Sequence, residues 1–246
     1  MQNRKQLLTI GKPKLVCINV PESKVNRDPH TREELVSTTT RTNTRASRIA
    51  SEFEKGFAFI KRYPKTVTFY GSARFKVSNI HYKDARRLAF AVSERGYAVV
   101  TGGGPGIMEA ANRGARDAGG PSLGLNIKLP AEQLVNPYVT DSENFEYFFA
   151  RKTALSFAAE AYVFYPGGFG TLDEFFEIIT LIQTKKITRV PVILVGSDFW
   201  LPLHAFLADE LRLRHATIGK NDLELYRITD DHAEILKIIE NAPIRK

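Results

Sequence analysis

The chain has 246 residues, of which 43% are apolar and 25% are charged. This length suits one large domain, or one domain with an appended arm, and the composition can bury a core. Cys17 is the only cysteine, which excludes an intramolecular disulfide and a multi-cysteine metal site. No apolar run approaches the roughly 18 residues that span a bilayer, and no apolar segment of a signal peptide follows the N-terminus. We therefore expect a soluble, cytoplasmic protein.

The formal net charge is +8, and the whole excess lies near the N-terminus. Residues 1–65 hold 14 basic and 6 acidic side chains, whereas residues 66–246 hold 21 of each. A basic arm can contact nucleic acid or an anionic surface, or it can be a solvated tail that packs on an acidic face of a sister subunit. We favour the second interpretation, because few aromatic residues accompany the charges.

Residues 1–45 form the predicted basic arm, and residues 46–246 form the predicted domain. The stretch 24–48 is polar and rich in Thr and Arg, which indicates an extended or mobile segment. The domain opens with an amphipathic helix over 46–61, where apolar residues recur at helical spacing: Ile49, Phe53, Phe57 and Ile60.

Predicted strands and helices then alternate along the chain. Short β-prone runs, several of which end at Gly or Pro, predict strands over 67–70, 98–101, 122–127, 145–149, 161–165 and 190–195, and a further short run follows at 226–228. Between them, helices are predicted over 82–95, 107–118, from 151, over 171–184, over 199–213 and from 230. Alternation of this kind is typical of βαβ units, and strands that are apolar throughout are typical of buried parallel sheets. The predicted fold is a Rossmann-like, doubly wound parallel α/β sheet with helices on both faces.

The first glycine cluster follows a predicted strand and opens a helix, with the sequence Thr101-Gly102-Gly103-Gly104-Pro105-Gly106-Ile107-Met108-Glu109. Glycines let backbone N–H groups approach an anion, which the helix N-terminus also favours. Ile107 stands where a dinucleotide fingerprint needs its third glycine, and no Gly-Lys-Ser/Thr of a P-loop follows. The cluster predicts a phosphate cradle that includes Gly103 and Gly104. The alternative is a tight turn that needs a positive φ.

The second glycine cluster also joins a strand to a helix, with the sequence Pro166-Gly167-Gly168-Phe169-Gly170-Thr171-Leu172-Asp173-Glu174. In doubly wound sheets ligands bind at the carboxyl ends of the strands, so both clusters are expected at one edge. Thr171 and Glu174 also have the spacing of a capping box, in which Thr171 caps the helix and Glu174 reaches back to the N-cap N–H. The spacing supports this structural role at least as well as a catalytic one.

Arg151 and Lys152 begin a predicted helix at the same edge. Cations at the amino end of a helix oppose its macrodipole, which favours an anionic ligand or a carboxylate partner over two solvated charges. Trp200 lies in an apolar run and is expected in the core. The five histidines are scattered, so we predict no metal site.

Together these residues resemble the LONELY GUY (LOG) family, the cytokinin riboside 5′-monophosphate phosphoribohydrolases long labelled lysine decarboxylases. The resemblance covers roughly residues 65–240, and the family's Pro-Gly-Gly-x-Gly-Thr-x-x-Glu motif is present without a mismatch at 166–174. The Gly71-Ser72 turn also fits. The long N-terminal extension is similar to the longer bacterial members, which often assemble beyond dimers, so the resemblance implies self-association.

The resemblance assigns site residues by motif. Arg151 and Glu174 match the family's catalytic pair. The residues that match substrate contacts, or are expected beside them, are Gly71, Ser72, Gly103, Gly104, Glu132, Lys152, Gly167, Gly168, Gly170, Thr171 and Thr180.

The implied reaction splits a nucleoside 5′-monophosphate, AMP or a cytokinin riboside monophosphate, into free base and ribose 5-phosphate, without a metal or cofactor. Glu174 would stabilise positive charge on the ribose or activate water. Arg151 stays protonated, so it would orient Glu174 or hold the phosphate or the leaving base.

Two other functions stay open. One is a non-catalytic nucleotide- or cofactor-binding protein of the same fold, and the other is a DNA-binding protein that uses the basic arm. We expect no membrane partner, and the intact Arg151 and Glu174 pair favours the enzyme. Nothing indicates the pyridoxal site that a decarboxylase needs.

Overall fold

The computed structural model describes residues 44–128 and 135–244. The chain divides into two units, Met1–Arg45 and Ala46–Lys246, and the fold described here is that of the second. Most of the predicted basic arm lies outside the described residues, as does Glu132.

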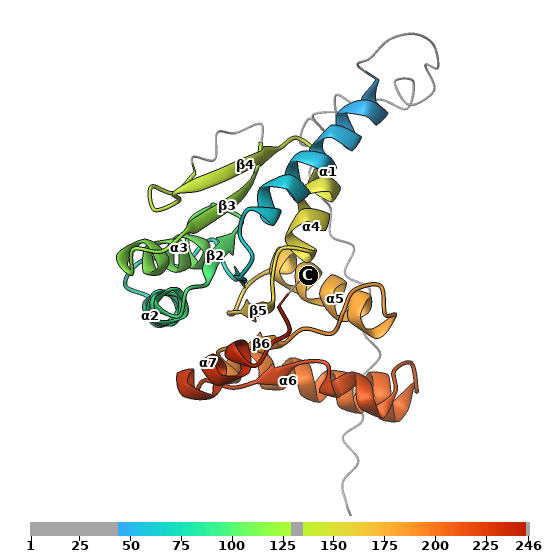
Figure 1. Ribbon diagram of the computed structural model, residues 1–246. Helices are drawn as coiled ribbons and strands as arrows, with labels where there is room; N and C mark the ends of the chain where they lie inside the picture. The colour runs from blue at the N-terminus through green and yellow to red at the C-terminus, as the bar shows by residue number, and fades with distance from the viewer. Residues whose placement is uncertain (1–43, 129–134, 245–246) are drawn as a thin grey trace, which may run out of the picture. The chain divides into compact units, whose positions relative to one another are not determined.

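Seven parallel strands form one sheet in the order β4-β3-β2-β1-β5-β6-β7, shown in Figure 1. Their bounds are β1 Thr66–Tyr70, β2 Ala98–Thr101, β3 Ser122–Ile127, β4 Asp141–Phe145, β5 Ala161–Phe164, β6 Val192–Leu194 and β7 Arg227–Ile228. The order runs outward from β1 in both directions, since β2 and β5 each pair with β1. The predicted doubly wound parallel sheet is confirmed.

Helices cover both faces of the sheet and enclose two separate cores. One face is covered by α1 (Arg45–Lys61), α4 (Phe148–Ser156), α5 (Phe169–Gln183) and α6 (Ser197–Phe206). The other face is covered by α2 (Ile80–Glu94), α3 (Ile107–Asp117) and α7 (His232–Glu240). The chain after α6 continues as a π-helix over Leu207–Arg214 and a 3₁₀ helix over Lys220–Glu224. Trp200 is fully buried in the first core, as predicted.

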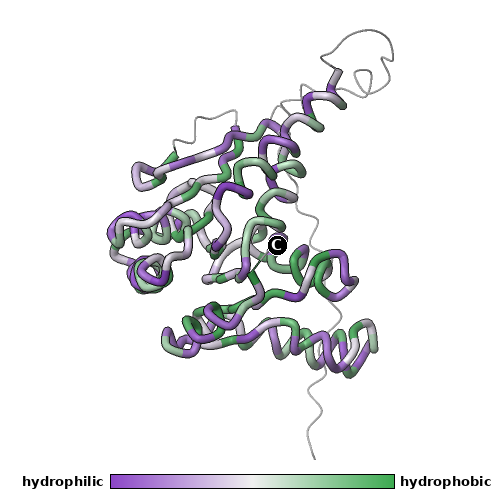
Figure 2. The backbone as a smooth tube through the Cα atoms, in the orientation of Figure 1, coloured by the Kyte–Doolittle hydropathy of each residue, from purple (hydrophilic) through white to green (hydrophobic). Residues whose placement is uncertain are grey.

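The strand predicted over 145–149 is wrong by four residues. β4 spans Asp141–Phe145, and α4 begins at Phe148. β4 is an edge strand whose first four residues are polar, and Figure 2 shows its hydrophilic character. The aromatic run that suggested a strand is the end of β4 followed by the start of α4. An edge strand pairs on one side only, so it does not need the apolar sequence of a buried one.

The same error displaced the start of the next helix. Because α4 begins at Phe148, Arg151 is its fourth residue and Lys152 its fifth, so they lie where the first turn ends and the second begins. The helix macrodipole therefore gives a weaker reason for an anion near these two cations than their predicted place at the helix start, since its effect fades beyond the first turn. Their partners have to be read from the structure.

Candidate functional site

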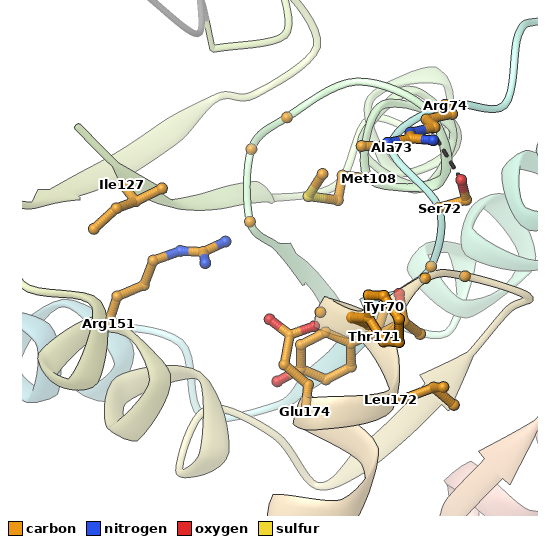
Figure 3. A pocket seen from close by; sticks show the side chains of 18 of the residues that line it. Tyr70, Ser72, Ala73, Arg74, Met108, Ile127, Arg151, Thr171, Leu172 and Glu174 are labelled. Carbon is orange, nitrogen blue, oxygen red and sulfur yellow. Dashed lines mark hydrogen bonds between the residues drawn. The ribbon is translucent and has the colours of Figure 1, made fainter. Parts of the chain in front are cut away.

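A cavity of about 780 Å³ opens at the carboxyl edge of the sheet, where the strand order reverses at β1 (Figure 3). Such crevices are where ligands bind in doubly wound sheets. The cavity is lined mainly by the loops after the strands and by the helices α4 and α5: residues 70–74, 102–104, 126–127, 148, 151, 167–172 and 174.

Most of the predicted site residues line this cavity. Those that do are Gly71, Ser72, Gly103, Gly104, Arg151, Gly167, Gly168, Gly170, Thr171 and Glu174. Lys152 and Thr180 do not, and the side chain of Thr180 is exposed on α5. Glu132 lies outside the described residues, so its contact with the substrate stays a prediction.

Backbone hydrogen bonds fix three of the loops against one another. The Ser72 N–H donates to the Pro166 carbonyl at 3.0 Å, and the Ile107 N–H donates to the Ser72 carbonyl at 3.0 Å. Gly106 has φ +70°, and a Cβ atom there would lie 2.2 Å from the Ser72 carbonyl oxygen. Only glycine fits this close approach. The loop after β1 is therefore held between the two glycine clusters.

The glycine cluster after β5 forms the start of α5. The helix begins at Phe169 with Gly168 as its N-cap, and no side chain caps it. A Cβ atom at Gly168 or Gly170 would meet no protein atom within 4 Å, and neither residue has a positive φ. Protein packing therefore does not explain these two glycines. They leave free the space in front of the helix N-terminus, where backbone N–H groups attract anions.

The capping box predicted for Thr171 and Glu174 does not form. Because α5 begins two residues earlier than predicted, Thr171 lies inside the first turn and Glu174 in the second. The Thr171 side chain packs against Gly167, where a Cβ atom would lie 2.1 Å from its hydroxyl oxygen. Glu174 does not reach back to the N-cap and instead lines the cavity.

The Glu174 carboxyl group is a weaker acid than an ordinary glutamate side chain. Burial raises its pKa from the ordinary value of 4.5 to about 7, although the positive charges of Arg151 and Lys152 act to lower it. At neutral pH this carboxyl group is divided between its two protonation states. Such a group can both accept and return a proton, which suits general acid–base catalysis.

Arg151 faces Glu174 from the other side of the cavity. Its side chain is 8% exposed, and its Nε donates a hydrogen bond to the Leu125 carbonyl at 2.7 Å. Burial lowers the pKa of the guanidinium, and the negative charge of Glu174 opposes that shift. Figure 3 shows the guanidinium and the carboxylate pointing toward one another, with the cavity between them. No ion pair between them occurs among the described residues, so both charges remain available to a ligand.

Lys152 has a different environment from its neighbour. Its Nζ forms ion pairs with Asp173 at 2.7 Å and with Glu177 at 3.2 Å. The sequence left two kinds of partner open for Lys152, an anionic ligand or a carboxylate. The structure shows carboxylate partners. Lys152 thus joins α4 to α5 beside the cavity.

Several cavity residues were not identified from the sequence. Five apolar side chains also line the cavity: Met108, Ile127, Val135, Phe148 and Phe199. These residues belong to no motif, and only their positions after strands or near helix starts could have suggested them. Tyr70 was placed in a strand, but its position directly before Gly71 brings it to the cavity floor.

Within the described part of the chain, neither a metal site nor a membrane span is found. Among residues 44–128 and 135–244, no group of three or more His, Cys, Asp or Glu side chains could hold a metal ion. In the same ranges no helix has the length and apolar character to cross a bilayer.

Comparisons with known proteins place the chain in a family. A family model described as "Possible lysine decarboxylase" matches residues 108–239. The cytokinin riboside 5′-monophosphate phosphoribohydrolase LOG of Oryza sativa subsp. japonica is 32% identical over 151 residues. That match covers 59% of this chain and 61% of the rice protein, so the chain spans about six-tenths of the length of this relative.

Two further matches are more distant. The pyrimidine/purine nucleotide 5′-monophosphate nucleosidase of Escherichia coli (strain K12) is 27% identical over 189 residues, which cover 71% of this chain and 40% of that protein. The solved molybdenum cofactor carrier protein of Chlamydomonas reinhardtii matches with a TM-score of 0.54 and 21% identity, covering 72% of this chain and 96% of that one. At this identity the second match shows the fold alone. Because the family model matches more than half of the chain, the protein belongs to the LONELY GUY family, for which "possible lysine decarboxylase" is the older description.

Proposed function

We propose that this protein hydrolyses the N-glycosidic bond of a nucleoside 5′-monophosphate, AMP or a cytokinin riboside monophosphate, to free base and ribose 5-phosphate. One observation carries the proposal: the Glu174 carboxyl group, with a pKa of about 7, faces the Arg151 guanidinium across a cavity that begins at an open helix N-terminus. The activities by which the rice and E. coli relatives are named support this class of substrate.

The 5′-phosphate binds at the start of α5 in this proposal. Gly168 and Gly170 leave room there, and the N–H groups of the first helical turn lack intrahelical partners. The positive end of the helix dipole adds a favourable field for the phosphate charge. This places the phosphate in the turn just before Glu174 on the same helix.

Glu174 then acts on the sugar carbon that carries the base. As the bond between C1′ and the base nitrogen breaks, positive charge develops on the ribose, and the ionised carboxylate stabilises it. Water attacks C1′, Glu174 accepts a proton from that water, and Glu174 passes this proton on to the departing base nitrogen. The products are ribose 5-phosphate and the neutral base, so one water molecule is consumed and no redox change occurs.

Arg151 holds the opposite side of the site. Its guanidinium stays protonated and cannot act as the acid, but it can donate hydrogen bonds to the departing base. The apolar side chains of Met108, Ile127 and Phe148 give that region of the cavity the character that suits a planar base.

The experiment is direct incubation of the purified full chain with AMP, isopentenyladenosine monophosphate and the other common nucleoside monophosphates. Free base and ribose 5-phosphate are followed by chromatography. Glu174→Gln keeps the shape of the side chain but cannot accept the proton, so we expect base release to fall by about 10²-fold or more. Thr180→Val is the matched control on the same helix, outside the cavity lining.

The outcomes separate the candidate functions. Base release by the wild type, lost in a folded Glu174→Gln protein, supports the hydrolase. If a folded wild type releases no base from any monophosphate, the hydrolase proposal is wrong. Nucleotide binding measured by calorimetry then identifies a non-catalytic binding protein.

A further inference from the structure

Tyr70 is the last residue of β1 and belongs to the floor of the cavity. We infer that its hydroxyl group donates a hydrogen bond to the sugar of the substrate, and that this contact makes the protein prefer ribonucleotides to deoxyribonucleotides. The inference rests on the proposed function and specifies the sugar that the same site accepts.

The first argument is the missing protein partner. Buried tyrosine hydroxyl groups usually find a hydrogen-bond acceptor. Four other tyrosines with buried rings do so within the protein: Tyr82 with Glu109, Tyr97 with the Ile239 carbonyl, Tyr162 with the Ser156 carbonyl and Tyr165 with Asp84. Tyr70 is only 4% exposed, yet its hydroxyl makes no hydrogen bond to any residue in the described ranges. Because Tyr70 lines the cavity, its hydroxyl is open to whatever occupies that cavity, and a bound ligand can supply the acceptor.

The second argument is the rigidity of the ring. Tyr70 stacks on Phe164 with 4.7 Å between ring centroids and an angle of 15° between the planes, and on Tyr162 at 6.4 Å. β1 also pairs with β5 at this position. The hydroxyl is thus held in place before a ligand arrives, so little conformational entropy is lost when it binds one.

The third argument is the position of Tyr70 between the groups that hold the substrate. Figure 3 shows its ring next to Thr171 and Glu174, with Arg151 across the cavity. In the proposed complex the phosphate lies at Gly168 to Thr171 and the base lies toward Arg151. The ribose joins these two parts, so it passes over Tyr70.

The ionisation of Tyr70 agrees with a donor role. Burial raises the pKa of its hydroxyl well above the ordinary value of 10, and the negative charge of Glu174 adds to that shift. The group therefore keeps its proton at neutral pH, where Glu174 is partly ionised. A hydroxyl group of the ribose can accept the hydrogen bond from Tyr70. A deoxyribose lacks one of these hydroxyl groups.

The test is a comparison of Tyr70→Phe with the wild type on AMP, 2′-deoxyadenosine monophosphate and 3′-deoxyadenosine monophosphate. Removal of the hydroxyl alone keeps the stacked ring. We expect kcat/KM for AMP to fall roughly ten-fold, as for the loss of one hydrogen bond. One deoxy substrate, the one that lacks the bonded hydroxyl, should be a poor wild-type substrate and should lose almost nothing in Tyr70→Phe.

Tyr162→Phe is the matched control, because its hydroxyl already has a protein acceptor. We expect that variant to melt at a lower temperature and to treat the three substrates as the wild type does. Equal losses on all three substrates in Tyr70→Phe, or no loss on any, would overturn the sugar contact.

Binding measurements separate this inference from the proposed function. If the wild type releases no base, the proposed function fails, but calorimetry with AMP and the two deoxy analogues still judges Tyr70. Weaker AMP binding in Tyr70→Phe, with one analogue unaffected, keeps the sugar contact. Identical binding of all three by both proteins overturns it.

Discussion

The Nζ atom of Lys152 lies 2.7 Å from the carboxylate of Asp173, so α4 and α5 are joined directly beside the residues that they contribute to the cavity. Arg151 precedes Lys152 on α4, and Glu174 follows Asp173 on α5. The ion pair thus links the two helices one residue away from each site residue. Lys152 does not line the cavity, and we predict that it positions Glu174 rather than contacting the substrate.

Substitution of Lys152 should shift the pH profile of base release. Lys152→Met leaves the carboxylates of Asp173 and Glu177 without their counter-charge, and both raise the pKa of Glu174. The acid limb of the rate profile then moves to higher pH, so activity at pH 6 falls several-fold more than activity at pH 8. Asp173→Asn removes one of these negative charges and moves the limb to lower pH. Lys152→Arg should keep the wild-type profile. If the profiles of Lys152→Met and Asp173→Asn also superimpose on that of the wild type, the positioning role of Lys152 is refuted.

Glu174 should reduce stability at neutral pH. Its pKa is about 7 in the folded protein and about 4.3 in an unfolded chain. The folded state therefore holds the proton more tightly. The resulting stabilisation is fully present below pH 4 and is lost as the pH rises from about 4 to 7. Glu174→Gln avoids this cost, so its free energy of unfolding at pH 8 should exceed that of the wild type by up to about 3 kcal/mol.

Denaturant unfolding at pH 4 and pH 8 tests this linkage. The gain of Glu174→Gln should be clear at pH 8 and absent at pH 4. A variant that is less stable than the wild type at pH 8 would show that the carboxylate is stabilised by contacts with the protein.

Gly170→Ala should separate binding from stability. The added Cβ meets no protein atom, and alanine inside a helix is favoured over glycine by about 0.5–1 kcal/mol. We therefore expect an equal or higher melting temperature. The methyl group enters the space proposed for the phosphate, so KM should rise roughly ten-fold or more. Unchanged KM in a folded variant would place the phosphate elsewhere.

Gly106→Ala should do the opposite and damage the fold. A Cβ at this position lies 2.2 Å from the Ser72 carbonyl oxygen, and φ is +70°. The loop after β1 must move, which should cost about 1–3 kcal/mol of stability. Thermal melting measures the loss. A melting temperature equal to that of the wild type would mean that the loops can separate without cost.

The sequence predicted the sheet well because its inner strands are mainly apolar, and because β1 and β2 are followed directly by glycine. β2 and β3 have the predicted bounds, and α3 begins at Ile107 as predicted. The prediction failed at β4, whose polar edge carries no apolar signal. It also failed at the start of α5, where Thr171 resembled an N-cap but lies within the helix. A local sequence pattern does not show at which residue a helix will begin, and therefore which backbone N–H groups will lack an intrahelical partner.

Only the part of the candidate site that is encoded in local sequence patterns was predicted. Glycine loops at strand ends are local features, so Gly168 and Gly170 could be found along the chain. The position of Tyr70 under Glu174, and the partners of Lys152, depend on how β1, α4 and α5 meet in space. No spacing within one segment encodes such contacts.

The reversal of strand order at β1 has a consequence for how this protein can evolve. The cavity wall formed by Gly102, Gly103 and Ile127 comes from one half of the sheet, whereas the wall formed by Gly168 to Glu174 comes from the other half. The two halves share β1 as their common neighbour. Under the proposed function, the base lies toward the first half of the sheet, and the phosphate and the carboxylate lie in the second half. Substitutions in the first half would then change the base that is recognised and leave the proposed catalytic side intact.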